Sequence, residues 1–404
     1  MNMKKLMGLL LGFGFLIGGG TIGGFTVEKS RYERAFAATA MTANEPTGLE
    51  IKAKAAYLMD KESGTEVYAK AAFERLPIAS MCKIMTLLLS FEAIDEGCFT
   101  LDDVITVSER AASMGGSQVF LEAGGTYPVR ELIKSIVVCS ANDSCVAMAE
   151  KIAGSELAFT EKMNAKAKEL GAENTLFANC TGLPKEPQYS CAHDVAKMLS
   201  ALVEHEEYFT FSGIWMDEFK HPEGRHTEMT NTNRLIRFYD GCDGGKTGFT
   251  NQAGFCLAAT AKRGDMRIIS VVIGEENGKR RFADVSSMFD YAFANYTLKR
   301  VVDAHNPLGD EVSVSGGVKK SVAVKAARES HLFSKRGESE DVSLEFKLKS
   351  SVKAPLKAGD KVGKVFVYRN GVEIDCVDLV AVESVRQASF SDTFKDVAEG
   401  WDFR

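Results

Sequence analysis

The sequence lacks an excess of basic residues. Beyond its first 27 residues it also lacks any long uncharged apolar run, and each of these absences excludes a class of protein. Its 404 residues include 49 lysines and arginines against 55 aspartates and glutamates, a formal net charge of −6. This balance argues against a nucleic-acid binder, which would carry a basic stripe. Without further apolar runs, a polytopic membrane protein is excluded as well. The 45% of hydrophobic residues suffices for a real core, and the length suits two or three domains.

The metal-binding motifs most easily found in a sequence are also missing. No two of the nine cysteines form a C-x-x-C pair, and the six histidines show no H-E-x-x-H spacing. We therefore expect no metal site. The odd number of cysteines argues against a full disulfide framework, and we predict buried or free thiols instead.

The N-terminus has the pattern of an export signal. Met1 to Lys5 form a short basic start, and no charge appears from Leu6 through Val27. Such a basic segment followed by an apolar one predicts a signal segment over residues 1–37, with cleavage before Ala38. Retention as an N-terminal membrane helix is the alternative.

The C-terminus, residues 387–404, predicts an amphipathic helix. Its apolar residues recur at helical spacing: Phe390, Phe394, Val397 and Trp401. This stripe could dock on the protein's own surface or lie in a membrane interface. The opposite face is mainly acidic, whereas helices drawn to anionic lipid are normally basic, so the sequence leaves both interpretations open.

Between these ends the pattern of hydrophobic and polar residues changes at about residue 300. Residues 45–300 mix antiparallel strand patterns with helical ones, including a helix that starts at Ser80 and ends at Gly97. Two apolar runs between Gly254 and Ile273 flank a turn and predict a hairpin. Residues 301–386 show short alternating runs, with a hairpin turn at Asn370-Gly371, and predict a small all-β domain.

Three short motifs carry the chemistry. They are S-x-x-K at Ser80 to Lys83, S-x-N at Ser140 to Asn142, and K-T-G at Lys246, Thr247 and Gly248. We predict them at a helix start, between two helices, and just ahead of a strand, respectively. Each motif alone is weak evidence, because its residue types are common. Their order, settings and spacings of 60 and 106 residues are far more specific.

The residue types suit nucleophilic catalysis. A serine hydroxyl needs a base to take its proton, and Ser80 and Lys83, three apart on a helix, share one face. Lys83 can act as that base only when it is neutral; burial beside a second cation, Lys246, would lower its pKa. Ser140 could relay the proton to a leaving amine, and Asn142 could hold Lys83 and a substrate amide by hydrogen bonds.

The remaining groups suit a substrate with a free carboxylate. The helix start at Ser80 and the backbone N–H of Phe249 could bind a developing oxyanion. Lys246 and Thr247 would receive a carboxylate. Arg234 and Arg281 could assist them, although we favour a structural ion pair for each.

At this point the sequence resembles the low-molecular-mass penicillin-binding proteins, the serine-type D-alanyl-D-alanine carboxypeptidases. Beyond the trio of motifs, the resemblance extends over about residues 45 to 385, and the stretches that carry it are PIASMCKIMT (77–86), SAND (140–143), NAKAKELGAENTLFANCTG (164–182), YSCAHD (189–194), NTNRL (231–235), DGGKTGFT (243–250) and APLKAGDKVGKVFVYRNGVEI (354–374). Two departures are mild: Cys82 stands where the family often has Thr, and Phe249 where His is frequent.

The resemblance implies an α+β fold of the penicillin-binding and β-lactamase-like type. A central antiparallel sheet, flanking helices and a helical subdomain (45–300) would be followed by a small β-sandwich domain (301–386). It implies removal of the terminal D-alanine from peptidoglycan stem pentapeptides through an acyl-Ser80 intermediate that β-lactams trap, at the extracytoplasmic face of the membrane or in the wall. No metal or organic cofactor would be needed. Family members often end in a membrane-tethering helix.

Three rival functions use the same fold. A serine β-lactamase would need a carboxylate to activate water, and Glu186 lies in the right general region but in an unfitting context. A non-catalytic penicillin sensor would keep acylation and lose turnover. A transpeptidase or endopeptidase would use the same residues on another acceptor or bond.

Overall fold

The structure, a computed structural model, describes residues 48–392 and 394. The predicted export segment and most of the predicted C-terminal helix lie outside the described residues. No helix among the described residues has the length and hydrophobicity needed to span a membrane.

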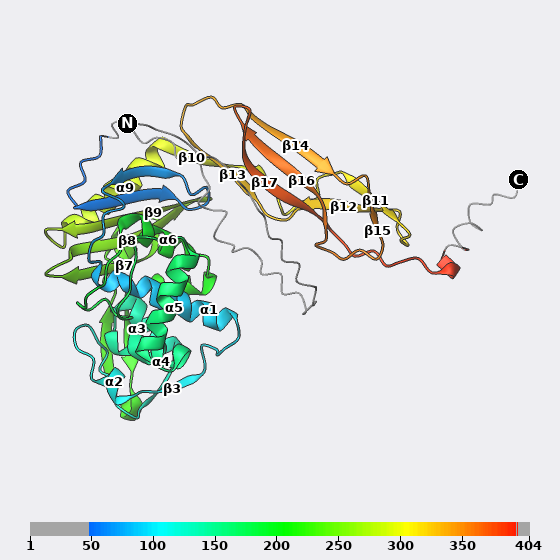
Figure 1. The fold of residues 1–404 in the computed structure, drawn as a ribbon. Helices are drawn as coiled ribbons and strands as arrows, with labels where there is room; N and C mark the ends of the chain where they lie inside the picture. Colours follow the sequence, from blue (N-terminus) through cyan, green and yellow to red (C-terminus); the bar gives the residue numbers. More distant parts are fainter. Residues whose placement is uncertain (1–47, 393, 395–404) are drawn as a thin grey trace, which may run out of the picture.

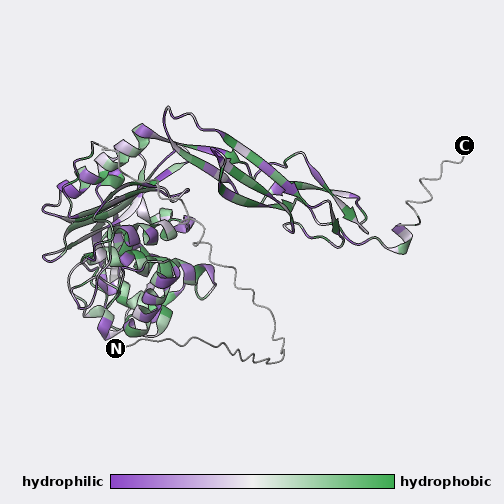
Figure 2. Cartoon of the chain, turned by 45° about the horizontal axis from the view of Figure 1, so that its top comes forward, coloured by the Kyte–Doolittle hydropathy of each residue, from purple (hydrophilic) through white to green (hydrophobic). Residues whose placement is uncertain are grey.

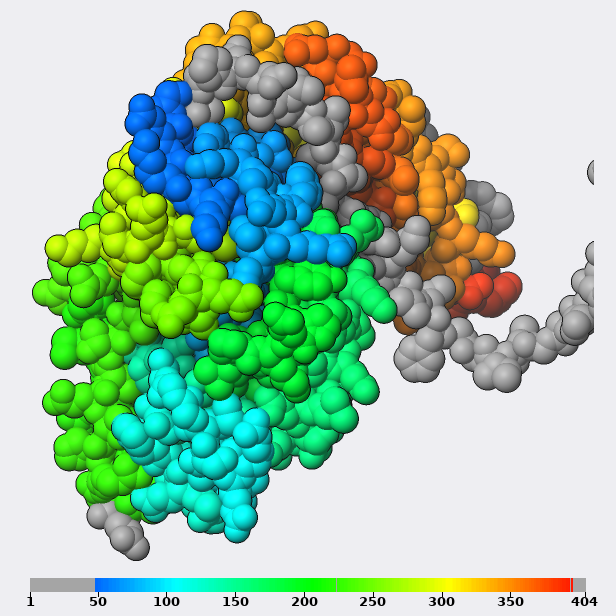
Figure 3. All heavy atoms as spheres, turned by 60° about the vertical axis from the view of Figure 1, so that its left-hand side comes forward, coloured from blue at the N-terminus to red at the C-terminus, as the bar shows by residue number. Residues whose placement is uncertain are grey.

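The first part of the chain is built on an antiparallel sheet of order β2-β1-β9-β8-β7. Its strands are β1 (Ala55–Asp60), β2 (Glu66–Lys70), β7 (Cys242–Thr250), β8 (Gly254–Arg263) and β9 (Met266–Glu275). The sheet joins the N-terminal hairpin to strands that lie some 200 residues later, so blue and yellow-green segments lie side by side in Figure 3. The predicted hairpin is confirmed as β8 and β9, whose turn holds Gly264 at φ +61°.

Both faces of this sheet are covered, which explains why every residue of β9 is buried. Side chains alternate along a strand, so Ile269 and Val271 pack with the helices on one face while Ile268 and Val272 pack on the other. On the second face lies α9 (Arg280–Asn295), with Met288 and Phe289 fully buried. The first face carries α6 (Ala192–Leu202) and, beyond it, the helical subdomain (Figure 1).

The helical subdomain surrounds α1. Its longer helices are α1 (Lys83–Asp95), α3 (Val129–Val138), α4 (Asn142–Ala153) and α5 (Glu156–Glu169). The short elements of this part of the chain are η1 (Ala79–Cys82), β3 (Val104–Thr106), α2 (Glu109–Ala112), β4 (Thr126–Pro128), η2 (Glu206–Tyr208), α7 (Phe209–Ser212), β5 (Met216–Lys220), η3 (Pro222–Gly224), β6 (His226–Thr230) and α8 (Leu235–Phe238). Apolar residues, green in Figure 2, gather where these helices face one another.

The C-terminal part is all β, as predicted. Its six-stranded sheet has the order β14-β16-β17-β12-β11-β15. The strands are β11 (Glu311–Ser315), β12 (Ser321–Ala326), β14 (Val342–Leu348), β15 (Ser351–Lys353), β16 (Lys361–Arg369) and β17 (Val372–Ala381). The turn between β16 and β17 is Asn370-Gly371, both with positive φ, which is the backbone conformation that favours this pair.

A two-stranded ribbon joins the two parts. β10 (Tyr296–Val302) follows α9 directly and pairs with β13 (Ser330–Lys335). Tyr296 stacks on Phe333 within the core shared with α9, with ring centroids 4.9 Å apart. Val302, at the other end of β10, belongs to the separate core of the β domain. The ribbon therefore enters both cores, and the β domain extends away from the sheet (Figure 1).

Two sequence predictions need correction. The helix predicted to start at Ser80 begins as the 3-10 turn η1, and regular α-helix starts only at Lys83. The K-T-G motif lies inside strand β7, not ahead of it. Sequence pattern could not show this, because a strand rich in glycine has little apolar alternation.

Because the two cores are separate, a cavity made in one of them should destabilise that part of the chain and leave the other unchanged. Leu379 on β17 is fully buried in the β-domain core, so Leu379→Ala should destabilise that domain by about 2–5 kcal/mol. Hydrogen exchange should then show faster exchange on β16 and β17 and unchanged protection on β8 and β9. The control, Val372→Ala at a 64% exposed position, should change neither. Equal loss of protection on β8 and β9 would show that the two cores unfold as one.

Candidate active site

Ser80 lies in a narrow gap between two segments that only glycine allows to approach. A Cβ on Gly248 of β7 would lie 2.6 Å from the carbonyl oxygen of Ile78, and one on Gly182 would lie 2.0 Å from that of Ala79. Both would also lie within 3.3 Å of the Ser80 nitrogen. Ala79 has φ +47°, a strained conformation for a residue with a Cβ. The backbone before Ser80 is thus tightly constrained by its surroundings.

Lys83 is held beside Ser80 and is completely buried. Its Nζ donates a hydrogen bond of 3.0 Å to Ser80 Oγ and one of 2.6 Å to the carbonyl oxygen of Thr181. The side chain has no exposed surface. The structure therefore brings together the serine and lysine of the S-x-x-K motif.

Lys246 brings a second buried amine to the same region, although it is far away in the sequence. It is 1% exposed, and burial together with the charge of Lys83 lowers its pKa to about 7. The pKa of Lys83 is also lowered, primarily by burial. The sequence argument combined burial with the charge of Lys246. In the structure desolvation is the largest effect on the pKa of both amines, and repulsion from Lys83 adds to it for Lys246.

The titratable groups that act most strongly on the pKa of Lys83 after burial are four thiols, which come from Cys82, Cys139, Cys145 and Cys180. Burial raises the pKa of each thiol, to about 11 for Cys139 and about 12 for Cys145, so they are neutral near pH 7. These thiols raise the pKa of Lys83, but by less than burial lowers it, whereas a carboxylate would hold Lys83 in its charged form. All nine cysteines are free, as predicted.

Ser140 lies between α3 and α4 in a strained conformation, with φ +68°. It is 4% exposed, and its Oγ is buried without a hydrogen-bond partner among the described residues. A buried hydroxyl left unpaired is costly, so this oxygen is available to a ligand or a transferred proton.

Asn142 differs in part from its predicted role. Its Nδ2 donates to the carbonyl oxygen of Gly115 at 2.7 Å, and this bond takes the place of the expected contact with Lys83. Its buried Oδ1 has no partner among the described residues, so the acceptor expected for a substrate amide is available. The neighbouring Asp143, which the sequence argument did not single out, accepts hydrogen bonds from the backbone N–H of Val119 and Leu121. Asp143 thereby anchors the loop that contains Val119 and Leu121 against the S-x-N motif.

Arg281 supports the K-T-G strand from the side of α9. Its Nη1 donates to the carbonyl oxygens of Gly248 (3.1 Å) and Cys256 (3.3 Å). The expected structural ion pair is wrong: no ion pair between described residues involves Arg281 or Arg234. Burial is the main cause that lowers the pKa of Arg281 to about 10, and the charge of Arg234 adds to it, against an opposite effect of Cys256. The guanidinium thus keeps uncompensated positive charge beside β7.

The other K-T-G residues lie at the edge of the sheet. Thr247 is 6% exposed, whereas Phe249 is half exposed and stacks on Phe255 with centroids 4.3 Å apart. Because β7 is an edge strand, part of its backbone N–H groups point away from β8, on the side where Gly248 approaches Ser80.

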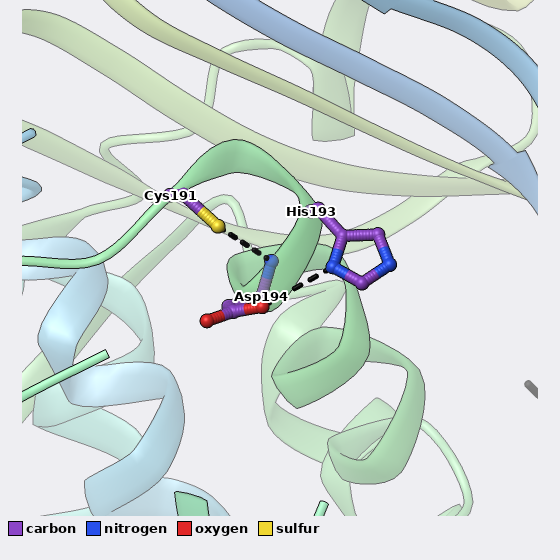
Figure 4. A group of neighbouring side chains, drawn as sticks. All are labelled: Cys191, His193 and Asp194. Atoms are coloured by element: carbon purple, nitrogen blue, oxygen red, sulfur yellow. Dashed lines mark hydrogen bonds and ion pairs between the residues drawn. The ribbon is translucent and has the colours of Figure 1, made fainter. Parts of the chain in front are cut away.

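Figure 4 shows one group of three side chains that could hold a metal, at the start of α6: Cys191, His193 and Asp194. Its atoms are already engaged. Cys191 Sγ accepts from the Asp194 N–H and caps the helix, and His193 Nδ1 lies 3.2 Å from Asp194 Oδ1. Asp194 Oδ2 accepts from Asn174 and Thr175, and burial raises the pKa of the thiol to about 12. These interactions explain the group as a helix cap.

Taken together, the site combines the half-buried hydroxyl of Ser80, the buried amines of Lys83 and Lys246, and the buried, unpaired hydroxyl of Ser140. The arrangement can pass a proton from Ser80 Oγ to Lys83 Nζ across 3.0 Å. Unpaired Ser140 Oγ and Asn142 Oδ1 can serve a reacting molecule, and the positive charge beside β7 can bind an anion.

Comparison with known proteins agrees with this geometry. Residues 39–277 match the family model described as D-alanyl-D-alanine carboxypeptidase, Peptidase_S11. Residues 296–387 match the C-terminal domain of penicillin-binding protein 5. The chain is 41% identical over 351 residues to the D-alanyl-D-alanine carboxypeptidase DacF of Bacillus subtilis, covering 87% of this chain and 90% of DacF. It is 32% identical over 391 residues to DacC of Escherichia coli, covering 91% and 92%.

The fold is also similar to solved structures. Penicillin-binding protein 5 from Haemophilus influenzae superposes with a TM-score of 0.67 at 30% identity, over 84% of this chain and 98% of that one. The predicted fold class, an antiparallel sheet with a helical subdomain followed by an all-β domain, is confirmed.

The coupling between the two amines can be measured directly. Lys83→Met removes the charge that opposes protonation of Lys246, so the pKa of Lys246 should rise above about 7 while burial keeps it below 10.5. NMR titration of ¹³C-labelled lysine side chains would follow it. The control, Lys262→Met at an exposed position of β8, should leave the Lys246 titration unchanged. An unchanged Lys246 pKa in Lys83→Met would contradict the coupling.

Proposed function

The chain belongs to the D-alanyl-D-alanine carboxypeptidase family of serine peptidases, and from this premise we propose that it removes the terminal D-alanine of peptidoglycan stem pentapeptides through an acyl intermediate on Ser80. The observation that carries the proposal is the 3.0 Å hydrogen bond between Lys83 Nζ, which is fully buried, and the Oγ of the partly buried Ser80. A serine beside a neutral amine is an activated nucleophile.

In the acylation step, Lys83 takes the proton of Ser80 as its oxygen attacks the carbonyl carbon of the penultimate D-alanine. The negative charge that develops on the carbonyl oxygen is bound by the backbone N–H groups of Ser80 and Phe249. Ser140, whose Oγ has no other partner among the described residues, passes a proton to the leaving amine. The C–N bond then breaks and D-alanine leaves.

Substrate binding uses the groups that the structure leaves open. Asn142 Oδ1 accepts a hydrogen bond from the peptide N–H, since its Nδ2 is occupied by Gly115. The terminal carboxylate is bound by Lys246 and Thr247, with Arg281 holding the Gly248 carbonyl and adding positive charge. In deacylation, water replaces the amine, and the same residues act in reverse to release Ser80.

Two of the rival functions on this fold, a β-lactamase and a non-catalytic penicillin sensor, are not favoured. Glu186, the only carboxylate considered for a β-lactamase, is exposed on the loop that follows Gly182, and the relatives of this chain are carboxypeptidases. A penicillin sensor without turnover has no support among them either.

The proposal includes export. Family members act on wall peptidoglycan, which implies work outside the cytoplasmic membrane, and the basic-then-apolar pattern of residues 1–37 supports a signal segment. We also propose domain boundaries at 45–300 and 301–386, supported by the separate cores. For a membrane-facing C-terminal helix, the support among described residues is the exposure of Phe390 (88%) and Phe394 (67%).

The proposal is tested at Ser80. Ser80→Ala should abolish release of D-alanine from a pentapeptide, because the nucleophile is lost. Mass spectrometry should find penicillin attached to the peptide containing Ser80 in the unaltered protein and no such label in Ser80→Ala. Ser313→Ala, at an exposed position of β11, should keep both properties. Continued release by Ser80→Ala, or a label on another peptide, would refute the assignment.

A further inference from the structure

The junction between the two cores carries a cluster of potential metal ligands that the proposed reaction does not use. Its members come from two short segments that the β10–β13 ribbon brings together: Asp303 and His305 just after β10, and Glu329 and His331 at the start of β13. The sequence argument looked for ligands a few residues apart in recognised motifs, and these are spread over 29 residues.

The distances fit a small cation. Ligand atoms of Asp303, His305 and Glu329 all lie within 4.8 Å of one another. His305 Nε2 lies 3.1 Å from Glu329 Oε1, and His331 Nε2 lies 3.3 Å from Glu329 Oε2. In a tetrahedral zinc site, bonds of about 2.0–2.1 Å separate neighbouring ligand atoms by about 3.3 Å. Atoms of Asp303, His305 and Glu329 are therefore close enough to bind one ion, and His331 contacts the second oxygen of Glu329.

The chemistry of the donors fits as well. One imidazole nitrogen and two carboxylates, with water in the fourth position, are a set that Zn²⁺ accepts, and the two carboxylates balance the charge of the ion. Asp303 is already oriented, because Oδ1 accepts from the backbone N–H of His305 (2.8 Å) and Oδ2 from Asn306 (2.7 Å). Such outer hydrogen bonds hold a ligating carboxylate in place.

We propose a Zn²⁺ site at the domain junction, formed by Asp303, His305 and Glu329, with His331 positioning Glu329 through its second oxygen. The ion would tie the end of β10 to the start of β13, where the ribbon enters the core of the β domain at Val302. In Figure 1 this is the point where the β domain departs from the rest of the molecule. The site would reinforce the pairing of these two strands where the ribbon meets the β domain.

Arg300 is the competitor for this position. Its Nη1 lies 2.7 Å from Glu329 Oε1 and 3.9 Å from Asp303 Oδ1, and it pairs across the ribbon with His331. Its side chain is 40% exposed, so it can turn toward solvent when the ion binds. Removing Arg300 should therefore strengthen Zn²⁺ binding, whereas removing a ligand should weaken it. If these residues formed only an ion-pair network, the two kinds of substitution would not have opposite effects on Zn²⁺ binding.

The test titrates Zn²⁺ into the metal-free full chain against a chromophoric chelator. One equivalent should bind; His305→Ala and His331→Ala should each weaken it by at least about tenfold, since even loss of a partner outside the ligand set typically costs about 10–100-fold. Arg300→Ala should tighten it. His226→Ala, at an exposed position on β6, should change nothing. His305 is 76% exposed, so its variant should fold normally, as circular dichroism would show.

The nine free thiols are the alternative binding groups, and Co²⁺ distinguishes them. The proposed site should give only weak d–d absorption, because it contains no sulfur, whereas thiolate ligands add an intense charge-transfer band. No binding, binding that survives both histidine substitutions, or a thiolate band from the single equivalent would each overturn the proposal.

Discussion

The account depends on one constraint: two lysine side chains are buried without a carboxylate among the groups that dominate their pKa, next to one serine hydroxyl. Burial of an ammonium group is costly, and a pKa of about 7 for Lys246 in place of 10.5 disfavours its charged form by on the order of 5 kcal/mol. The cost falls on whichever amine is protonated, and repulsion prevents both from being charged together near neutral pH. A base ready to accept a proton follows from where the fold places these side chains.

The backbone maintains this arrangement. Gly182 and Gly248 let two segments approach the Ser80 nitrogen so closely that a methyl group would clash, while Ala79 and Ser140 adopt positive φ values that neither residue favours. Arg281 fixes the Gly248 carbonyl from the opposite side, and Asp143 anchors the loop against Asn142. The strained backbone at Ala79 and Ser140 is held in place by the surrounding core, in which the inner faces of α1, α3 and α4 are almost wholly buried.

Much of this was predictable from sequence, for physical reasons that can be stated. The three motifs contain the reacting residue types in fixed order, so Ser80, Lys83, Ser140 and Lys246 could be named, and apolar periodicity located α3, α4 and the β8–β9 hairpin. The hydrogen bond of Asn142 to Gly115 could not be predicted, because it depends on a loop 27 residues away. Nor could the sequence show that burial affects the pKa of Lys83 more than the charge of Lys246 does, since desolvation is a property of the packed site. The cluster around Glu329 was missed because cross-strand pairing, not local spacing, assembles it.

The most direct test of the central claim is the pH dependence of acylation by a β-lactam, followed before turnover begins. If Lys83 must be neutral, the rate should rise with pH through an apparent pKa well below 10.5 that belongs to the coupled amines, and then level off. The rise is expected because deprotonation creates the base. A rate that is independent of pH over this interval, or that rises only near the ordinary lysine pKa, would contradict the claim that burial keeps the base uncharged.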